Sequence, residues 1–268
     1  MEIILGTYIF LFGLIIGSFL NVVIYRFNTG ASLKGRSMCF SCGKTLYWYE
    51  LIPVLSFLLQ RGRCRACGAK ISWQYPLVEL LTGSLYFGVF LIAGHDWIYF
   101  CYLILQMTLL IIIGVYDLRH KIIPDTFSYA FAGLSLLYIF YEFFFGGFSG
   151  NIFISLAAGP IYFLPFAAMW YFSKGTWMGF GDAKLALGIG WFLGLGYAYI
   201  SMMMSFWVGA LVGLALISYG KLTGFAKNTE KVTMKSEIPF GPFLILGVLA
   251  MVFFGSYAER FLSLFIFY

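Results

Sequence analysis

The chain has 268 residues, of which 62% are hydrophobic and only 10% are charged, and its mean hydropathy is +0.90. Soluble globular domains carry about 25% charged residues, so this composition excludes an ordinary soluble protein and predicts a polytopic membrane protein. The formal net charge of +6 does not indicate a nucleic-acid-binding protein. The basic residues gather in loops beside apolar segments, where they are typical of membrane-topology signals.

Eight segments are expected to cross a bilayer, since a spanning helix needs about 20 mostly apolar residues. The N-terminal residues Met1-Glu2-Ile3-Ile4 contain no basic segment, and no cleavage site of small residues is present. We therefore expect the first span to be a retained helix rather than a signal peptide. The predicted spans are residues 4–24, 74–94, 97–116, 124–144, 152–172, 183–198, 200–220 and 239–256. The predicted fold class is an all-α polytopic membrane protein with about eight transmembrane helices.

The lysine and arginine residues predict the orientation of the chain. Sixteen of the 17 fall in alternate loops, on one side of the predicted membrane, and only Arg260 falls on the other side. The positive-inside rule makes the basic side cytoplasmic. Both termini are then expected outside, and three carboxylates are expected at the cytoplasmic face: Asp117, Asp125 and Asp182.

Two spans contain pairs of small residues four positions apart. These are Gly13 and Gly17 in the first span, and Gly209 and Gly213 in the seventh. Such small-xxx-small patterns allow two helices to approach closely, so helix packing is expected at both places. Asn21, near the end of the first span, is expected to hydrogen-bond a neighbouring helix.

Four of the five cysteines form two CxxC pairs, Cys39-Phe40-Ser41-Cys42 and Cys64-Arg65-Ala66-Cys67, separated by 21 residues. This spacing is close to a two-knuckle zinc pattern, and four thiolates around Zn²⁺ form a closed structural site. A glycine follows each pair (Gly43 and Gly68), as two matching turns require. We therefore predict a small cytoplasmic zinc domain after the first helix, with no open metal position for hydrolysis.

A redox-active cysteine pair is the alternative for these four residues. Structural disulfides are not expected, because thiols are kept reduced in the cytosol. The fifth cysteine, Cys101, lies alone in an apolar segment and is expected to be an inert packing residue.

The stretch Gly179-Phe180-Gly181-Asp182 directly precedes an apolar segment. A carboxylate at the entry to a membrane span is costly and is therefore a candidate for function. The glycines permit unusual backbone angles and the close approach of another backbone. An ordinary helix N-cap is the alternative for Asp182.

Asp117 ends the third predicted span, and Asp125, directly after Pro124, begins the fourth as an expected N-cap. An acid at a helix C-terminus faces the negative end of the helix dipole, so Asp117 lacks a simple structural explanation. If the third and sixth spans pack together, Asp117 and Asp182 share one proton. The ionised member then activates water and the protonated member donates to a scissile carbonyl, which predicts metal-independent aspartyl peptide hydrolysis.

Two further features have open interpretations. Pro239-Phe240-Gly241-Pro242 makes the entry to the last span irregular. Irregular backbone near a membrane is typical of a cavity lining, and a plain turn is the alternative. Glu79 is an acid inside the second span. A functional role and a role in interhelical packing are equally possible interpretations of this residue.

Together these motifs resemble the type IV prepilin peptidases, which are GxGD intramembrane aspartyl proteases. The resemblance includes Gly17-Ser18-Phe19-Leu20-Asn21, both CxxC pairs, Tyr75-Pro76-Leu77-Val78-Glu79-Leu80, residues 117–125, the GxGD stretch and residues 239–242. It implies that Asp117 and Asp182 are catalytic. The candidate site also includes Gly179 and Gly181, which leave room for a substrate backbone, and Pro239 and Gly241 of the irregular entry. The predicted metal ligands are Cys39, Cys42, Cys64 and Cys67.

The resemblance also implies a biological role. Expected substrates are prepilins or pseudopilins in the bacterial inner membrane, cut after a glycine that follows a short basic leader. N-methylation of the new amine by S-adenosylmethionine is expected by resemblance alone, because no glycine-rich βαβ unit shows a cofactor site. The predicted domains are a first transmembrane helix (1–26), a cytoplasmic zinc-binding domain associated with methylation (27–72) and a transmembrane peptidase domain (73–268).

Two other classes of function compete with this one. A proton-coupled transporter with a zinc-stabilised cap would use intramembrane acids, but these acids lie at the membrane face and no inverted repeat with broken helices is evident. A scaffold that binds partners through the cysteine domain would leave Asp117 and Asp182 dispensable.

Overall fold

The structure is a computed structural model, and it describes residues 2–30, 32, 34–94, 96–146, 148, 150–222 and 239–266. Side chains are described for these residues except 217, 219–222 and 256–266. Most of the last basic loop, residues 223–238, lies outside the described part of the chain.

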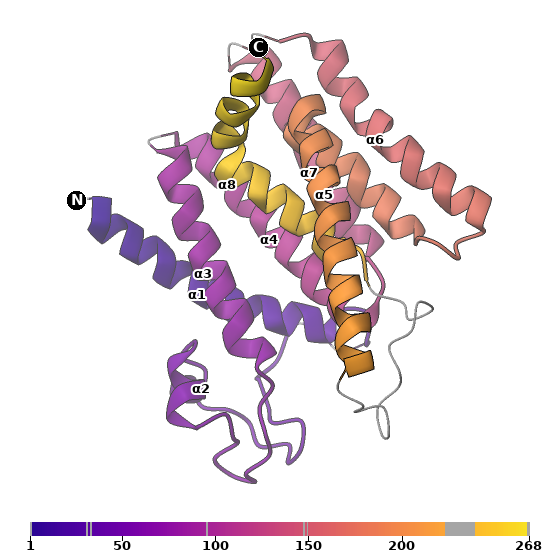
Figure 1. The fold of residues 1–268 in the computed structure, drawn as a ribbon. Helices are drawn as coiled ribbons and strands as arrows, with labels where there is room; N and C mark the ends of the chain where they lie inside the picture. The colour runs from indigo at the N-terminus through magenta and orange to yellow at the C-terminus, as the bar shows by residue number, and fades with distance from the viewer. Residues whose placement is uncertain are drawn as a thin grey trace. The chain divides into compact units, whose positions relative to one another are not determined.

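Helices make up most of the described residues (Figure 1). They are α1 (Glu2–Arg26), the 3-10 helix η1 (Trp48–Glu50), α2 (Leu55–Leu59), α3 (Gln74–Ala93), α4 (Trp97–His120), α5 (Asp125–Phe144), α6 (Ile152–Ser173), α7 (Phe180–Leu222) and α8 (Gly241–Ile266). Among the described residues six helices are long and apolar enough to cross a membrane: α1, α3, α4, α5, α6 and α7. The prediction of an all-helical chain with several membrane spans is confirmed.

The sixth and seventh predicted spans form one continuous element, α7, of 43 residues. Gly194 interrupts it with φ 72° and ψ 177°, a conformation that is open essentially only to glycine. The element therefore consists of two helical segments joined at Gly194. The last predicted span corresponds to a shorter apolar helix, Gly241–Gly255, at the start of α8.

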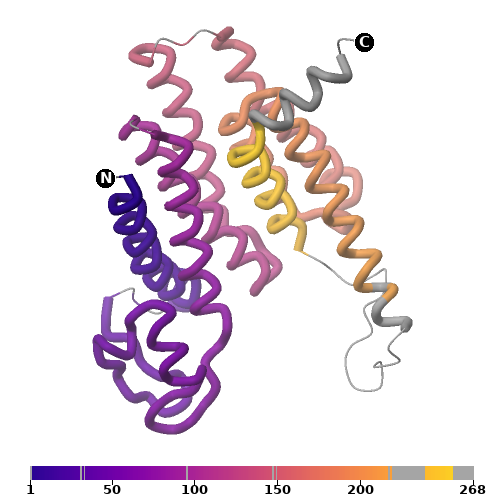
Figure 2. The backbone as a smooth tube through the Cα atoms, turned by 60° about the vertical axis from the view of Figure 1, so that its left-hand side comes forward, coloured from indigo at the N-terminus to yellow at the C-terminus, as the bar shows by residue number. Residues whose placement is uncertain are grey.

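The chain divides into two compact units, Met1–Val115 and Tyr116–Tyr268, with the boundary inside α4. In the first unit α1 lies beside α3, and the cysteine-containing segment connects them (Figure 2). A Cβ atom built on Gly13 would lie 2.7 Å from the Gly83 Cα, and one on Gly17 would lie 2.7 Å from the Glu79 Cα. The small-residue pattern of the first span thus marks a close helix contact, as predicted.

Asn21 connects the same two helices. It is fully buried, its Nδ2 donates to the Tyr75 carbonyl (3.2 Å), and its Oδ1 accepts from Gln74 Nε2 (3.5 Å). The expected bond to a neighbouring helix is confirmed. It positions the last turns of α1 against the first turn of α3, where the cysteine domain begins and ends.

In the second unit α5, α6 and α8 all pack against α7 (Figure 1). Glycine again allows a close contact, since a Cβ on Gly190 of α7 would lie 2.5 Å from the Ala158 carbonyl oxygen of α6. The predicted pattern in the seventh span behaves differently. Gly213 has no described neighbour within 4 Å of a built Cβ, and Gly209 has only an ordinary contact with Phe243 at 3.5 Å. The expected packing is thus present at Gly209 as an ordinary contact, without the close backbone approach seen at Gly13.

These contacts predict opposite effects of the same substitution at two similar motifs. Gly13→Ala should lower the free energy of unfolding by about 1–3 kcal/mol, because the methyl group overlaps the α3 backbone. Gly213→Ala should be neutral or stabilising by up to ~1 kcal/mol, because alanine is the better helix former. Thermal unfolding in detergent measures both, and equal midpoints for the two variants would contradict the packing described.

Candidate active site and candidate metal centre

Asp117 lies in the last turn of α4 and is 4% exposed. Its Oδ2 accepts a hydrogen bond from the N–H of Gly241, the first residue of α8 (3.1 Å). The first N–H groups of a helix lack intrahelical partners and carry the positive end of its dipole. The start of α8 therefore offsets the unfavourable position of Asp117 at the end of its own helix, a structural explanation that the sequence did not provide.

Gly241 has no room for a side chain. A Cβ atom there would lie 2.6 Å from Asp117 Oδ2 and 3.1 Å from Ile123 Cδ1. The irregular entry that includes Pro239 and Gly241 thus brings a backbone donor against the carboxylate. Pro239 itself is half-buried at the start of this described segment.

Asp182 lies within the first turn of α7, two residues after its start at Phe180. The alternative of an N-cap is therefore wrong. Asp182 is 7% exposed, and its Oδ1 is buried with no hydrogen-bond partner among the described residues. Ile123 lies against Gly181, which precedes Asp182, and against Gly241, which donates to Asp117, so the structure brings the two predicted residues around one side chain.

The two glycines beside Phe180 do not adopt the expected unusual angles. Within the described chain neither Gly179 nor Gly181 has a positive φ. Gly181 instead provides space, because a Cβ there would lie 2.8 Å from Ile123 Cβ. Ile123 therefore lies against both Gly181 and Gly241. The sequence analysis did not identify it as a site residue, because its apolar side chain is like those of its sequence neighbours.

Asp125 is not the N-cap of α5, because Pro124 occupies that position without a side-chain cap bond. Asp125 Oδ2 instead forms an ion pair with Lys184 Nζ at 2.6 Å. The same Nζ lies 4.9 Å from the centre of the Phe180 ring. The pair joins the starts of α5 and α7 and packs against the GxGD stretch.

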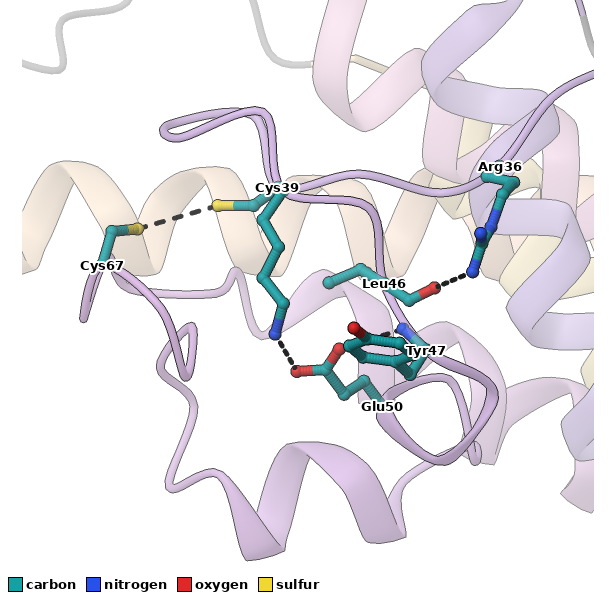
Figure 3. A network of polar contacts seen from close by, with 7 residues as sticks. Arg36, Cys39, Leu46, Tyr47, Glu50 and Cys67 are labelled. Atoms are coloured by element: carbon teal, nitrogen blue, oxygen red, sulfur yellow. Dashed lines mark hydrogen bonds and ion pairs between the residues drawn. The ribbon is translucent and has the colours of Figure 1, made fainter.

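The four paired cysteines form the candidate metal centre. Their Sγ atoms all lie within 4.8 Å of one another, and the Cys39 and Cys67 sulfurs are 3.9 Å apart (Figure 3). Zinc–sulfur bonds of about 2.3 Å in a tetrahedron place sulfurs about 3.8 Å apart. The predicted grouping of Cys39, Cys42, Cys64 and Cys67 is confirmed, and its geometry fits a tetrahedral metal ion.

The two cysteine pairs lie on matching turns, as predicted. The N–H of Gly43 donates to the Cys39 carbonyl, and that of Gly68 to the Cys64 carbonyl, both at 2.9 Å. The two glycines have φ values of +70° and +72°. Each turn requires a left-handed residue, which explains the glycine after each pair.

The environment of the thiols favours metal binding. The backbone N–H groups of Cys42 and Ser41 lower the pKa of Cys39 to about 6. At Cys67 the Ala69 N–H also favours the thiolate, but desolvation and the neighbouring thiols raise its pKa to about 11. The Cys39 thiol therefore loses its proton easily, whereas deprotonation of all four thiols is unfavourable. A bound dication would stabilise the four thiolates by its positive charge.

An ion pair between a half-buried lysine and a buried glutamate supports this domain (Figure 3). Lys44 Nζ lies 3.0 Å from Glu50 Oε1, and the Tyr47 N–H donates to Glu50 Oε2 (2.9 Å). The Tyr47 N–H, followed by Lys44, lowers the pKa of Glu50 against the opposing effect of burial. The first cysteine turn is thereby fastened to η1.

Comparisons with known proteins decide the family. Residues 11–93 match the family described as "Bacterial Peptidase A24 N-terminal domain", and residues 104–214 match the "Type IV leader peptidase family". A "Prepilin leader peptidase/N-methyltransferase" of Aeromonas hydrophila is 33% identical, over 96% of this chain and 94% of that protein. The chain belongs to the type IV leader peptidase family.

Further relatives of this leader peptidase carry the same name. One from Bacillus subtilis is 32% identical over 92% of this chain and 94% of its own length. One from Myxococcus xanthus is 35% identical over 84% of this chain and 67% of its own length. No solved structure gives a significant match. The family expected from the motifs is confirmed.

The geometry of these four cysteines predicts a tetrahedral metal site. Adding Co²⁺ to metal-free protein should give the visible absorption of a tetrahedral thiolate complex, since the four sulfurs lie within 4.8 Å of one another. Cys42→Ser should weaken or abolish these bands. Cys101→Ser is the matched control and should leave them unchanged, and a change in that variant would contradict the assignment.

Proposed function

We propose that this leader peptidase removes the short basic leader from type IV prepilins or pseudopilins at the cytoplasmic membrane face and N-methylates the new N-terminal residue. The observation that carries the proposal is the similarity, over nearly the full length of both chains, to proteins named for these two activities. The alternative of a proton-coupled transporter has no support from these relatives.

We assign leader cleavage to Asp117 and Asp182. The Gly241 N–H bond stabilises the ionised form of Asp117, so Asp117 takes the role of general base. Asp182 carries the shared proton, and its Oδ1 has no hydrogen-bond partner in the part of the chain that the structure describes. Asp117 removes a proton from water as the water oxygen attacks the peptide carbonyl, and Asp182 gives its proton to the carbonyl oxygen, which forms a tetrahedral diol. Asp117 then gives its proton to the amide nitrogen as the C–N bond breaks, and one diol hydroxyl returns its proton to Asp182.

The residues around the aspartates have supporting roles in this proposal. Gly241 donates to Asp117 and leaves space for its carboxylate. Gly181 makes room for Ile123, Gly179 leaves space beside Asp182, and Pro239 shapes the entry to α8. A substrate backbone requires such space beside the reacting carboxylates.

We assign methylation to the N-terminal region that contains the cysteine domain. Zn²⁺ held by Cys39, Cys42, Cys64 and Cys67 is proposed to be structural, because four thiolates leave no position for a substrate. S-adenosylmethionine, when bound, supplies an electrophilic methyl group. The proposed functional divisions are the first helix (1–26), the zinc domain (27–72) and the peptidase domain (73–268).

We further propose eight spans in the bacterial inner membrane, with both termini outside. The two segments of α7 contain 43 residues in all, which is about 65 Å of helix and roughly twice the hydrocarbon thickness of a bilayer. Its break at Gly194 supports two spans. The shorter apolar helix Gly241–Gly255 would be the eighth.

One assay tests both activities. Purified protein is mixed with a peptide that has a basic leader, a glycine and an apolar helix, with and without S-adenosylmethionine. We expect the mass of the cleaved product in both samples and an additional methyl group only with the cofactor. An intact peptide in both samples would contradict leader cleavage.

Neutral replacements test the aspartate assignment. Asp117→Asn and Asp182→Asn should each slow leader cleavage by about 100-fold or more, because each removes an acid–base group. Glu142→Gln is the matched control, because it also replaces an acid by its amide but lies near the C-terminal end of α5. It should cleave the leader normally. Normal cleavage by either aspartate variant that still inserts into membranes would favour the scaffold alternative.

Loss of the metal should separate the two activities. Cys39→Ser or Cys64→Ser should reduce methylation more than leader cleavage, because the cysteine turns belong to the N-terminal region and the aspartates to the second unit. The ratio of methylated to unmethylated cleaved product measures this effect. An unchanged ratio in a protein shown to lack metal would contradict the assignment of methylation.

A further inference from the structure

The first unit contains a cavity of about 320 Å³. None of the residues assigned to leader cleavage belongs to its lining. Its walls come from the end of α1, the start of α3 and the cysteine domain. The volume lies in the range of roughly 300–1,000 Å³ that is typical of small-molecule sites. The lining residues, 18–79, all fall within the match to the A24 N-terminal domain.

One wall of the cavity is aromatic. The Tyr25 and Tyr75 rings are stacked, with centroids 5.2 Å apart and planes at 9°, and the Phe40 ring lies 5.7 Å from Tyr25. They come from α1, α3 and the first cysteine turn. Such a group of rings can stack on a flat heteroaromatic ring and attract a cation.

Two buried acids line the cavity, and their environments differ. Glu50 is paired with Lys44. Glu79 is 6% exposed and its Oε2 accepts the Val54 N–H (2.7 Å), but no cation pairs with it among the described residues. A buried carboxylate is unfavourable without a compensating charge, so Glu79 is suited to a cationic ligand.

The backbone that holds Glu79 is strained. Val54 has φ +61° and ψ −52°, which is an outlier for a β-branched residue. Strain of this kind persists where the surrounding structure enforces it, and it clusters at functional sites. The Val54 N–H thus fixes the Glu79 carboxylate at the cavity, although the strain costs stability.

We propose that this cavity binds S-adenosylmethionine, with the aromatic wall taking the adenine ring and Glu79 facing the cationic sulfonium group. This inference rests on the proposed methyltransferase function and gives it a site. The ligand combines a flat aromatic ring with a positive charge, and the cavity has a partner for each. A lipid chain, the alternative occupant, would leave the Glu79 carboxylate uncompensated.

Cross-linking locates the site directly. Full-length protein in detergent is irradiated with ultraviolet light in the presence of radiolabelled S-adenosylmethionine, and the adduct is mapped by mass spectrometry. We expect it on a peptide that contains Tyr25, Phe40 or Tyr75, and excess S-adenosylhomocysteine should prevent it. An adduct within residues 116–268, or no competable adduct, would overturn the inference.

Affinities test the role of the Glu79 charge. Glu79→Gln keeps an acceptor for the Val54 N–H but loses the charge. By equilibrium dialysis it should bind S-adenosylmethionine roughly tenfold more weakly and S-adenosylhomocysteine, which has a neutral sulfur, less than about threefold more weakly. Glu142→Gln should bind both normally. Equal loss for the two ligands, or none, would overturn the role of Glu79.

A second pair of variants tests the aromatic wall without a change of charge. Tyr75→Phe keeps the stacked ring and should keep the affinity for both ligands, whereas Tyr75→Leu should weaken both. Equal affinities of these two variants would count against the aromatic wall. Tetrahedral Co²⁺ bands in each variant show that the cysteine domain is folded.

The outcomes separate this inference from the proposed function. Wild-type protein that cleaves and methylates, with unchanged cofactor binding in Glu79→Gln and Tyr75→Leu, would overturn the cavity as the site and leave the function intact. Wild-type protein that neither binds the cofactor nor methylates would overturn both the cavity and the methyltransferase assignment. Leader cleavage is judged by its own assay.

Discussion

The burial of two carboxylates among apolar helices is the constraint on which the second unit depends. Asp117 is stabilised by the first N–H of α8, and Asp182 lies in the first turn of α7. Both acids are therefore close to the positive end of a helix dipole, where an anion is favoured. This requirement explains why the starts of α7 and α8 meet the end of α4, and why the Gly241 position admits no side chain.

Glycine performs three different tasks in this chain. Gly43 and Gly68 adopt positive φ in the cysteine turns, Gly13 allows a helix backbone to approach, and Gly241 leaves space for a carboxylate. The residue type alone does not tell these tasks apart. Gly213 belongs to the same sequence pattern as Gly13, yet no described atom lies near it. The task depends on what the fold places opposite each glycine.

The first unit contains cysteine turns, whose geometry is determined locally, and a cavity, which exists only in the folded unit. The cysteine turns are closed by hydrogen bonds within a few residues, so their geometry follows from short-range sequence. The cavity beside them depends on α1 and α3, which are distant in sequence and joined by the Asn21 bonds and the Gly13 and Gly17 contacts. Its aromatic wall and its buried acid belong to different elements and become one surface only in the folded unit.

The sequence by itself determined the membrane class, the positions of the helices, the matching cysteine turns and the family. Each of these follows from composition, short-range pattern or a motif of fixed spacing. It misjudged Asp125 as a cap and left open which property of Gly179 and Gly181 the fold uses. The reason is that ion pairs such as Asp125–Lys184 and contacts such as Gly181–Ile123 join distant segments.

Only the tertiary structure decided what surrounds Asp117, why Gly241 admits no side chain and which residues share a cavity. The physical reason is that the dipole of one helix, or the carbonyl and side-chain groups of another, act on a residue through space. No local pattern in the sequence records which helix ends will meet.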